Sequence, residues 1–101
     1  MTGELLEAMS KDLGIASDVL LNLFMGQTQL MRMNYYPPCP QPNKVLGASA
    51  HTDGAGLTLL LHVNDVQGLQ IRKDKMWFSV EPLPGAFVVN IGDIFEVGLR
   101  F

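Results

Sequence analysis

Two residues that can bind a metal, His51 and Asp53, lie two positions apart in the segment LGASAHTD, residues 46–53. On a β-strand, residues at this spacing project from the same face, so the imidazole and the carboxylate would converge. One imidazole nitrogen and one carboxylate oxygen are two of the three ligands of the 2-His-1-carboxylate triad, which binds non-haem Fe(II) and leaves coordination positions open. The alternative is that Asp53 only orients a surface histidine or forms the turn at a strand end.

A third ligand would have to come from a distant part of the chain. His62 is the only other histidine, and it lies on a strand-like run where a hydrogen-bonding residue is the better interpretation. The small residues Gly54, Ala55 and Gly56 follow the pair directly and predict a turn that leaves space beside it. Cys39 has no histidine or other base near it in the sequence, so we do not expect it to act as a nucleophile.

The period of the hydrophobic pattern predicts helices before residue 28 and strands after it. Leu5, Leu6, Met9 and Leu13 have helical spacing and precede Gly14, a typical helix-ending residue. Ser17 is expected to cap a second helix over residues 18–24, which ends before Gly26. The strand candidates, separated by turn-forming segments, are residues 29–36, 45–51, 57–63, 69–72, 77–80 and 87–91.

The segment PPCPQPN, residues 37–43, is a proline-rich connector between two of these candidates. Several short strands in succession are typical of a sandwich, jelly roll or barrel. We therefore expect a mainly β fold with N-terminal helices. The expected organisation is a helical lead-in over residues 1–27, a jelly-roll part over 28–97 and a short tail over 98–101.

Composition excludes several partner classes. The chain has 101 residues, a net charge of −3 and only 17% charged residues, against about 25% in typical domains. This balance predicts no nucleic-acid partner, and no apolar run reaches the roughly 20 residues of a membrane span. The N-terminus lacks the pattern of a signal peptide, and a single cysteine fits a reducing compartment, so the expected location is the cytoplasm.

The runs MRMNYYPPCPQP, residues 31–42, and LGASAHTDGAGLTLLLHVNDVQGLQIRKDKMWFSVEPLPGAFVVNIGD, residues 46–93, carry a family resemblance. The chain resembles the plant Fe(II)/2-oxoglutarate-dependent dioxygenases, most of all the oxygenases and demethylases that act on alkaloids and flavonoids in specialised metabolism. The resemblance covers nearly everything from Leu5 to about Val97.

The resemblance implies an incomplete double-stranded β-helix, or jelly-roll, core with His51 and Asp53 as iron ligands. Asn34 and Tyr36 match family positions beside the 2-oxoglutarate site, where an amide and a phenol suit a carboxylate. The implied cofactors are Fe(II) and 2-oxoglutarate, with ascorbate as a supporting reductant. The implied reaction consumes dioxygen, releases succinate and hydroxylates, desaturates or demethylates a small organic molecule.

Two family elements are missing from the sequence. The distal histidine and the arginine that clamps 2-oxoglutarate lie farther downstream in the family than the eight residues that follow Asp93. The resemblance also stops abruptly at Gly98, which predicts a truncated product that is inactive or weak. The alternatives are a catalytically dead short homologue that binds a protein partner and a metal-binding module without turnover. Unpaired sheet edges would then favour self-association.

Overall fold

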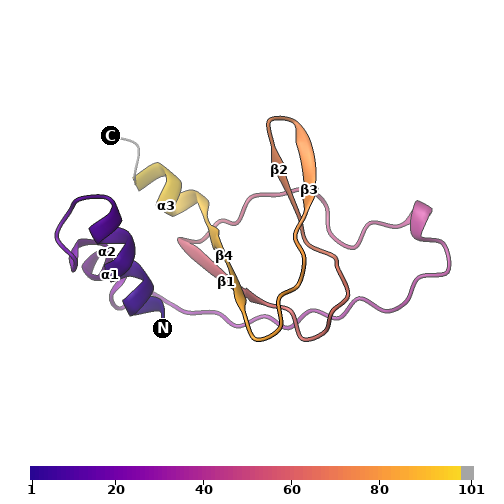
Figure 1. The fold of residues 1–101 in the computed structure, drawn as a ribbon, viewed down its shortest axis with the longest axis horizontal. Coiled ribbons are helices and arrows are strands. Elements are labelled where there is room, and N and C mark those ends of the chain that lie inside the picture. Colours follow the sequence, from indigo (N-terminus) through magenta and orange to yellow (C-terminus); the bar gives the residue numbers. More distant parts are fainter. Residues whose placement is uncertain (99–101) are drawn as a thin grey trace. The chain divides into compact units, whose positions relative to one another are not determined.

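The structure is a computed structural model that describes residues 1–98. It forms two compact units, Met1–Pro40 and Gln41–Phe101, whose elements are labelled in Figure 1. Within the described residues, no helix combines the length and the apolar character needed to cross a membrane. The last three positions of the predicted tail, residues 99–101, lie outside the described residues.

The first unit contains the two predicted helices. Helix α1 spans Thr2–Asp12 and helix α2 spans Val19–Phe24, and Leu6 and Leu20 bury their side chains. Ser10 is fully buried, and its hydroxyl oxygen accepts a hydrogen bond from the backbone N–H of Leu20 at 3.3 Å. Gly14 follows α1 with a φ of 72°, a left-handed conformation that a glycine adopts without steric cost.

The start of the second helix differs from the prediction. The N-cap residue is Asp18 rather than Ser17, and its side chain makes no capping hydrogen bond. The Asp18 carboxylate instead accepts a bond from the side-chain amide of Asn22 at 3.4 Å. The helix therefore begins one position later than the Ser17 interpretation required, because Asp18 occupies the capping position itself.

Two of the predicted strands are not formed. Residues 29–36 and 45–51 have no regular strand structure, and the short 3₁₀ helix η1, Pro42–Lys44, lies between the two segments. Side chains on both alternating faces of the first segment are exposed, as Leu30 at 93% and Met31 at 91% illustrate. A strand requires a hydrogen-bonded neighbour, and within residues 1–98 neither segment pairs with another one.

The other four predicted strands form two antiparallel pairs in the second unit. Strand β1, Leu57–Leu61, pairs with β4, Phe87–Ile91, and Leu57 lies opposite Ile91. Strand β2, Gln70–Lys73, pairs with β3, Met76–Ser79. Each strand agrees with its predicted position to within two residues at either end.

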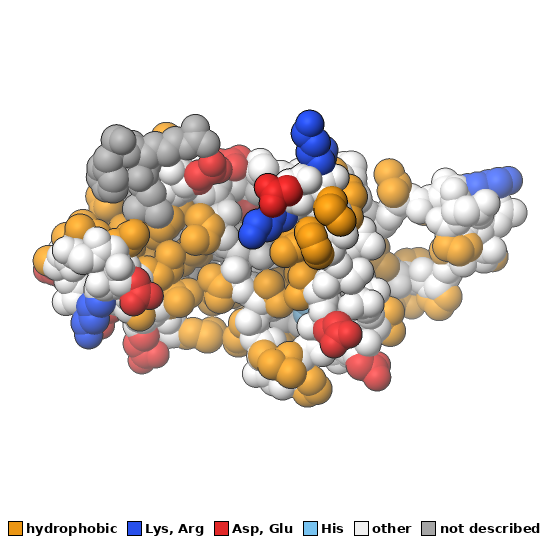
Figure 2. All heavy atoms as spheres, turned by 45° about the horizontal axis from the view of Figure 1, so that its top comes forward, with side chains coloured by type: hydrophobic (Ala, Val, Ile, Leu, Met, Phe, Trp, Pro, Cys, Tyr) orange, Lys and Arg blue, Asp and Glu red, His pale blue; other side chains and the backbone are white. Residues whose placement is uncertain are grey.

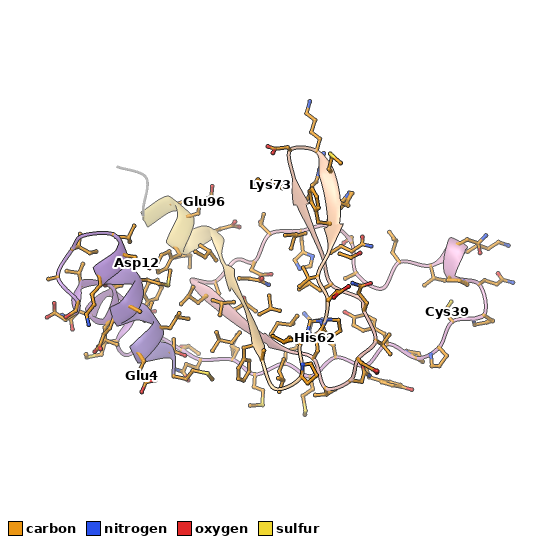
Figure 3. All side chains as sticks on the ribbon, viewed as in Figure 1. Glu4, Asp12, Cys39, His62, Lys73 and Glu96 are labelled. Atoms are coloured by element: carbon orange, nitrogen blue, oxygen red, sulfur yellow. The ribbon has the colours of Figure 1, made fainter. Side chains whose placement is uncertain are left out.

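The β2–β3 hairpin turns through two residues. Asp74 and Lys75 have φ values of 51° and 66°, as a type I′ turn requires, and Figure 3 shows Lys73 near the tip. The turn that was predicted at this position is confirmed.

Helix α3, Asp93–Gly98, follows β4 and was not predicted. Its Phe95 side chain is only 3% exposed. Many other apolar side chains of the chain remain exposed, and Figure 2 shows them spread over the visible surface.

Candidate metal centre

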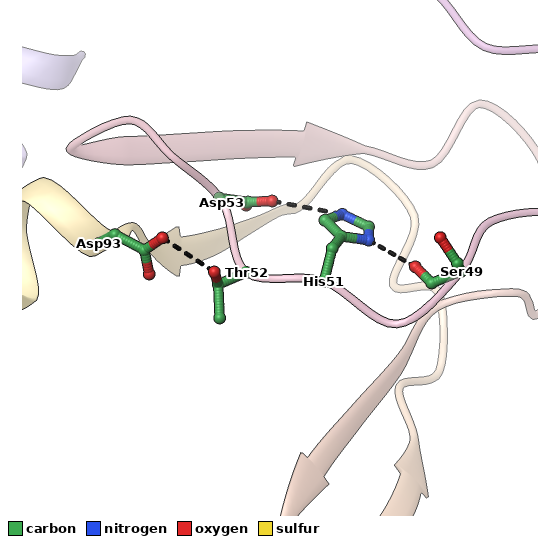
Figure 4. Close-up of polar contacts among 5 residues, drawn as sticks. All are labelled: Ser49, His51, Thr52, Asp53 and Asp93. Atoms are coloured by element: carbon green, nitrogen blue, oxygen red, sulfur yellow. Dashed lines mark hydrogen bonds and ion pairs between the residues drawn. The ribbon is translucent and has the colours of Figure 1, made fainter.

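His51 and Asp53 meet in the segment that leads into β1. Their side chains approach to 3.6 Å between His51 Nε2 and Asp53 Oδ1, as Figure 4 shows. The segment has no regular strand structure, and a bend over residues 54–56 connects it to β1. The His51 side chain is 63% exposed and that of Asp53 is 26% exposed, so the pair faces solvent on one side.

A backbone carbonyl orients the His51 ring. The Nδ1 atom lies 2.7 Å from the carbonyl oxygen of Ser49, and a carbonyl can only accept, so Nδ1 carries the hydrogen and donates it. In the neutral ring this leaves a lone pair on Nε2, the atom that faces Asp53. Such a bond on the second ring nitrogen is the usual companion of a metal-ligating histidine.

The spacing and the donor types fit one metal ion. Protein nitrogen and oxygen ligands bind divalent metals at about 2.0–2.2 Å, so two donors can share an ion when they lie within about 4 Å of each other. The 3.6 Å between His51 Nε2 and Asp53 Oδ1 satisfies this condition. Within residues 1–98, however, no group of three histidine, cysteine, aspartate or glutamate side chains forms a metal site. Among the described residues, the candidate metal site therefore consists of two possible ligands, His51 and Asp53.

The turn between β4 and α3 contacts residues 49–56, which we call the ligand segment after its two candidate metal ligands. The Thr52 hydroxyl donates to Asp93 Oδ2 at 2.8 Å, and the Asp93 backbone N–H donates to the carbonyl oxygen of Asp53 at 2.8 Å. The backbone N–H of Gly92 donates to the carbonyl oxygen of Gly56, also at 2.8 Å. Thr52, Gly92 and Asp93 were not among the residues predicted to belong to the site. The Gly-Asp dipeptide after an apolar strand was the available signal.

The remaining site candidates lie elsewhere. His62 follows the end of β1, is half-buried and joins no three-residue metal group within residues 1–98. Asn34 and Tyr36 belong to the first unit, in the irregular segment that was predicted as a strand, and both are exposed. The strand predicted over residues 29–36, which would have placed both side chains on one face, is not formed, because the segment has no strand partner among the described residues.

Comparison with known proteins identifies the family. The family model described as the 2OG-Fe(II) oxygenase superfamily matches residues 27–98. Protein SRG1 of Arabidopsis thaliana is 54% identical over 92% of this chain and 26% of its own length. Codeine O-demethylase of Papaver somniferum is 58% identical over 77% of this chain and 22% of its own length. Both relatives are plant proteins, as the resemblance predicted.

A solved structure supports the same assignment. The crystal structure of JOX2 in complex with 2OG, Fe, and JA superimposes with a TM-score of 0.82 at 39% identity, covering 95% of this chain and 29% of that one. The predicted fold class, an incomplete jelly-roll core preceded by helices, is confirmed.

The chain belongs to the 2OG-Fe(II) oxygenase superfamily. The superfamily is one of Fe(II)- and 2-oxoglutarate-dependent oxygenases, which agrees with the predicted family and with the cofactors predicted for it. The chain spans about a quarter of the length of the curated relatives it matches.

Proposed function

We propose that this chain forms the part of a plant Fe(II)- and 2-oxoglutarate-dependent oxygenase that supplies two iron ligands, His51 and Asp53. The observation that carries this proposal is the 3.6 Å approach of His51 Nε2 to Asp53 Oδ1. The Ser49 carbonyl oxygen, which accepts from Nδ1, leaves the Nε2 lone pair on the side of Asp53. Bound Fe(II) supplies the activation of dioxygen that the residues themselves cannot perform. The residues contribute a fixed imidazole and a carboxylate on one side of the ion.

Asn34 and Tyr36 are proposed to hold 2-oxoglutarate. An amide N–H and a phenol O–H both donate hydrogen bonds to carboxylates, and the exposure of both side chains leaves them accessible. Binding of 2-oxoglutarate by these groups would fix the cosubstrate by charge-assisted hydrogen bonds.

The proposed substrate is a small organic molecule that is hydroxylated, desaturated or demethylated. The names of three relatives support this class: codeine O-demethylase and thebaine 6-O-demethylase of Papaver somniferum, and oxoglutarate-dependent flavonoid 7-O-demethylase 1 of Ocimum basilicum. Dioxygen is the second small-molecule partner.

We also propose a helical lead-in over residues 1–27, an oxygenase part over residues 28–97 and a cytoplasmic location. The single free thiol of Cys39 is consistent with that location.

Metal titration of the 101-residue chain tests this proposal. Mn(II), which has the same charge as Fe(II) and does not oxidise in air, is added to the unaltered chain and to the H51A, D53A and H62A variants. We expect saturable binding that is lost in H51A and D53A and unchanged in H62A, because His62 joins no three-residue metal group in the described part of the chain. Equal binding by H51A and the unaltered chain would overturn the proposal.

A second candidate function follows from the two-ligand set. Within residues 1–98 no third ligand joins His51 and Asp53, so a module that binds metal without turnover is the alternative. Succinate release from 2-oxoglutarate, measured with Fe(II), ascorbate and air, separates the two functions. Metal binding with succinate at background supports the binding module, and metal-dependent succinate that disappears in H51A supports the oxygenase.

Exposed apolar side chains on the β2–β3 hairpin favour self-association of the chain. Ile71, Met76 and Trp77 are between 47% and 62% exposed, and strands of two-stranded sheets have unpaired edges. We propose that the chain self-associates through these edges, which sedimentation at several protein concentrations would reveal as a rising mass.

A further inference from the structure

The ligand segment and the β4–α3 turn are joined by a compact set of contacts between residues far apart in the sequence. Thr52 and Asp93 are separated by 41 positions. Three hydrogen bonds of 2.8 Å connect the two segments: Thr52 Oγ1 to Asp93 Oδ2, Asp93 N–H to Asp53 C=O, and Gly92 N–H to Gly56 C=O. Figure 4 shows Asp93 at one end of the ligand segment and Ser49 at the other.

The backbone approach at Gly92 is too close for any other residue. A Cβ built on Gly92 would overlap the carbonyl oxygen of Ala55 and lie 3.0 Å from that of Asp53. Gly92 and Gly56 are both buried where the two segments of the chain meet. Position 92 therefore requires glycine because there is no space for a Cβ atom, and not because of a positive φ.

Thr52 is the residue between the two proposed metal ligands. In an extended segment its side chain projects away from the face that His51 and Asp53 share, and its hydroxyl donates to Asp93. An ionised carboxylate accepts without needing a proton of its own, which makes this bond stronger than one between neutral groups. Asp93 thereby restrains Thr52 through its hydroxyl group and Asp53 through its backbone carbonyl oxygen.

We propose that Gly92 and Asp93 form a positioning clamp that holds His51 and Asp53 at metal-binding distance through Thr52. This inference rests on the proposed function and adds to it the residues that fix the ligand geometry. Asp93 acts through Thr52 rather than as a ligand, because one of its oxygens is bonded to the Thr52 hydroxyl and the residue joins no three-residue metal group within residues 1–98.

Thr52 offers a matched pair of variants. T52V replaces the hydroxyl by a methyl group of similar size and removes the bond to Asp93, whereas T52S keeps the hydroxyl. Partners that orient metal ligands typically contribute about 10- to 100-fold to metal affinity. We expect T52V and D93A each to bind Mn(II) about 10- to 100-fold more weakly and T52S to bind like the unaltered chain. The double variant T52V/D93A should bind Mn(II) with the same affinity as the single variant that binds it less tightly, since both substitutions remove the same hydrogen bond.

Amide hydrogen exchange of the metal-free chain provides a readout that does not depend on metal. The Asp93 and Gly92 amides are the donors of the clamp, so their exchange should be faster in T52V and remain slow in T52S. If T52V leaves both the exchange rates and the Mn(II) affinity unchanged, the clamp is wrong. If the clamp is wrong in this way but H51A still abolishes Mn(II) binding, the proposed function remains intact. Binding unaffected by H51A would overturn the proposed function itself.

Discussion

Replacement of Gly92 by alanine should destabilise the second unit of the chain. The new Cβ would overlap the carbonyl oxygen of Ala55, and the structure has two ways to respond. If the segments stay in place, the overlap costs about 1–3 kcal/mol, as overpacking does in other interiors. If they separate, the hydrogen bonds that Gly92 and Asp93 donate to the ligand segment are lost, which costs about 0.5–1.5 kcal/mol each. Either response lowers the free energy of unfolding by about 1–3 kcal/mol.

Urea unfolding monitored by Trp77 fluorescence measures this change, because Trp77 is the only tryptophan and lies in the same unit. Gly68 provides the matched control, since a Cβ there meets nothing within 4 Å and its φ is not in the left-handed region. With a urea dependence of about 1–2 kcal/mol per molar, G92A should lower the midpoint by roughly 0.5–3 M, and G68A should change it little. Equal midpoints for G92A and G68A would refute the close approach on which the reasoning depends.

Three further changes test other parts of the account. S10A removes the acceptor of the buried Leu20 N–H and should lower the unfolding free energy by about 1–3 kcal/mol, measured as the loss of helical circular dichroism in urea; no loss would contradict the role of that bond. Alanine at Gly14, whose φ is 72°, should cost about 1–2 kcal/mol from left-handed strain alone, because open space surrounds the position; a neutral result would show that the α1 terminus relaxes. Y36F should weaken 2-oxoglutarate binding to the Mn(II)-loaded chain by about tenfold or more, the worth of a hydrogen bond to a charged group, whereas the neighbouring Y35F should not; equal effects in calorimetry would remove the proposed role of Tyr36.

Helices α1 and α2 and four of the strands could be predicted because their signals are local, whereas helix α3 was not predicted. Gly14 and Gly26 both end a helix with positive φ values of 72° and 77°, which is the role that their positions after apolar helical patterns suggested. The β2–β3 hairpin likewise needs only a two-residue turn. Residues 29–36 alternate as a strand would, but alternation does not reveal whether a neighbouring strand exists to accept the hydrogen bonds.

The site shows the same division between local and long-range information. The approach of His51 to Asp53 follows from their spacing, and it occurs even though the segment is not a regular strand. The Thr52–Asp93 bond joins positions 41 residues apart, and the tight contact of Gly92 depends on how β4 ends beside the ligand segment. The Gly92-Asp93 dipeptide after an apolar strand indicates a turn, but nothing in the sequence indicates which segment that turn contacts, so only the fold reveals these contacts.

The most direct test of the central claim, that His51 and Asp53 bind the metal, is electron spin-echo spectroscopy of Mn(II) bound to the chain with ¹⁵N-labelled histidine. The two-ligand set predicts a coupling to one imidazole nitrogen that persists in H62A, vanishes in H51A, and weakens together with metal affinity in D53A. A coupling that persists in H51A, or its absence from the unaltered chain with Mn(II) bound, would contradict the account.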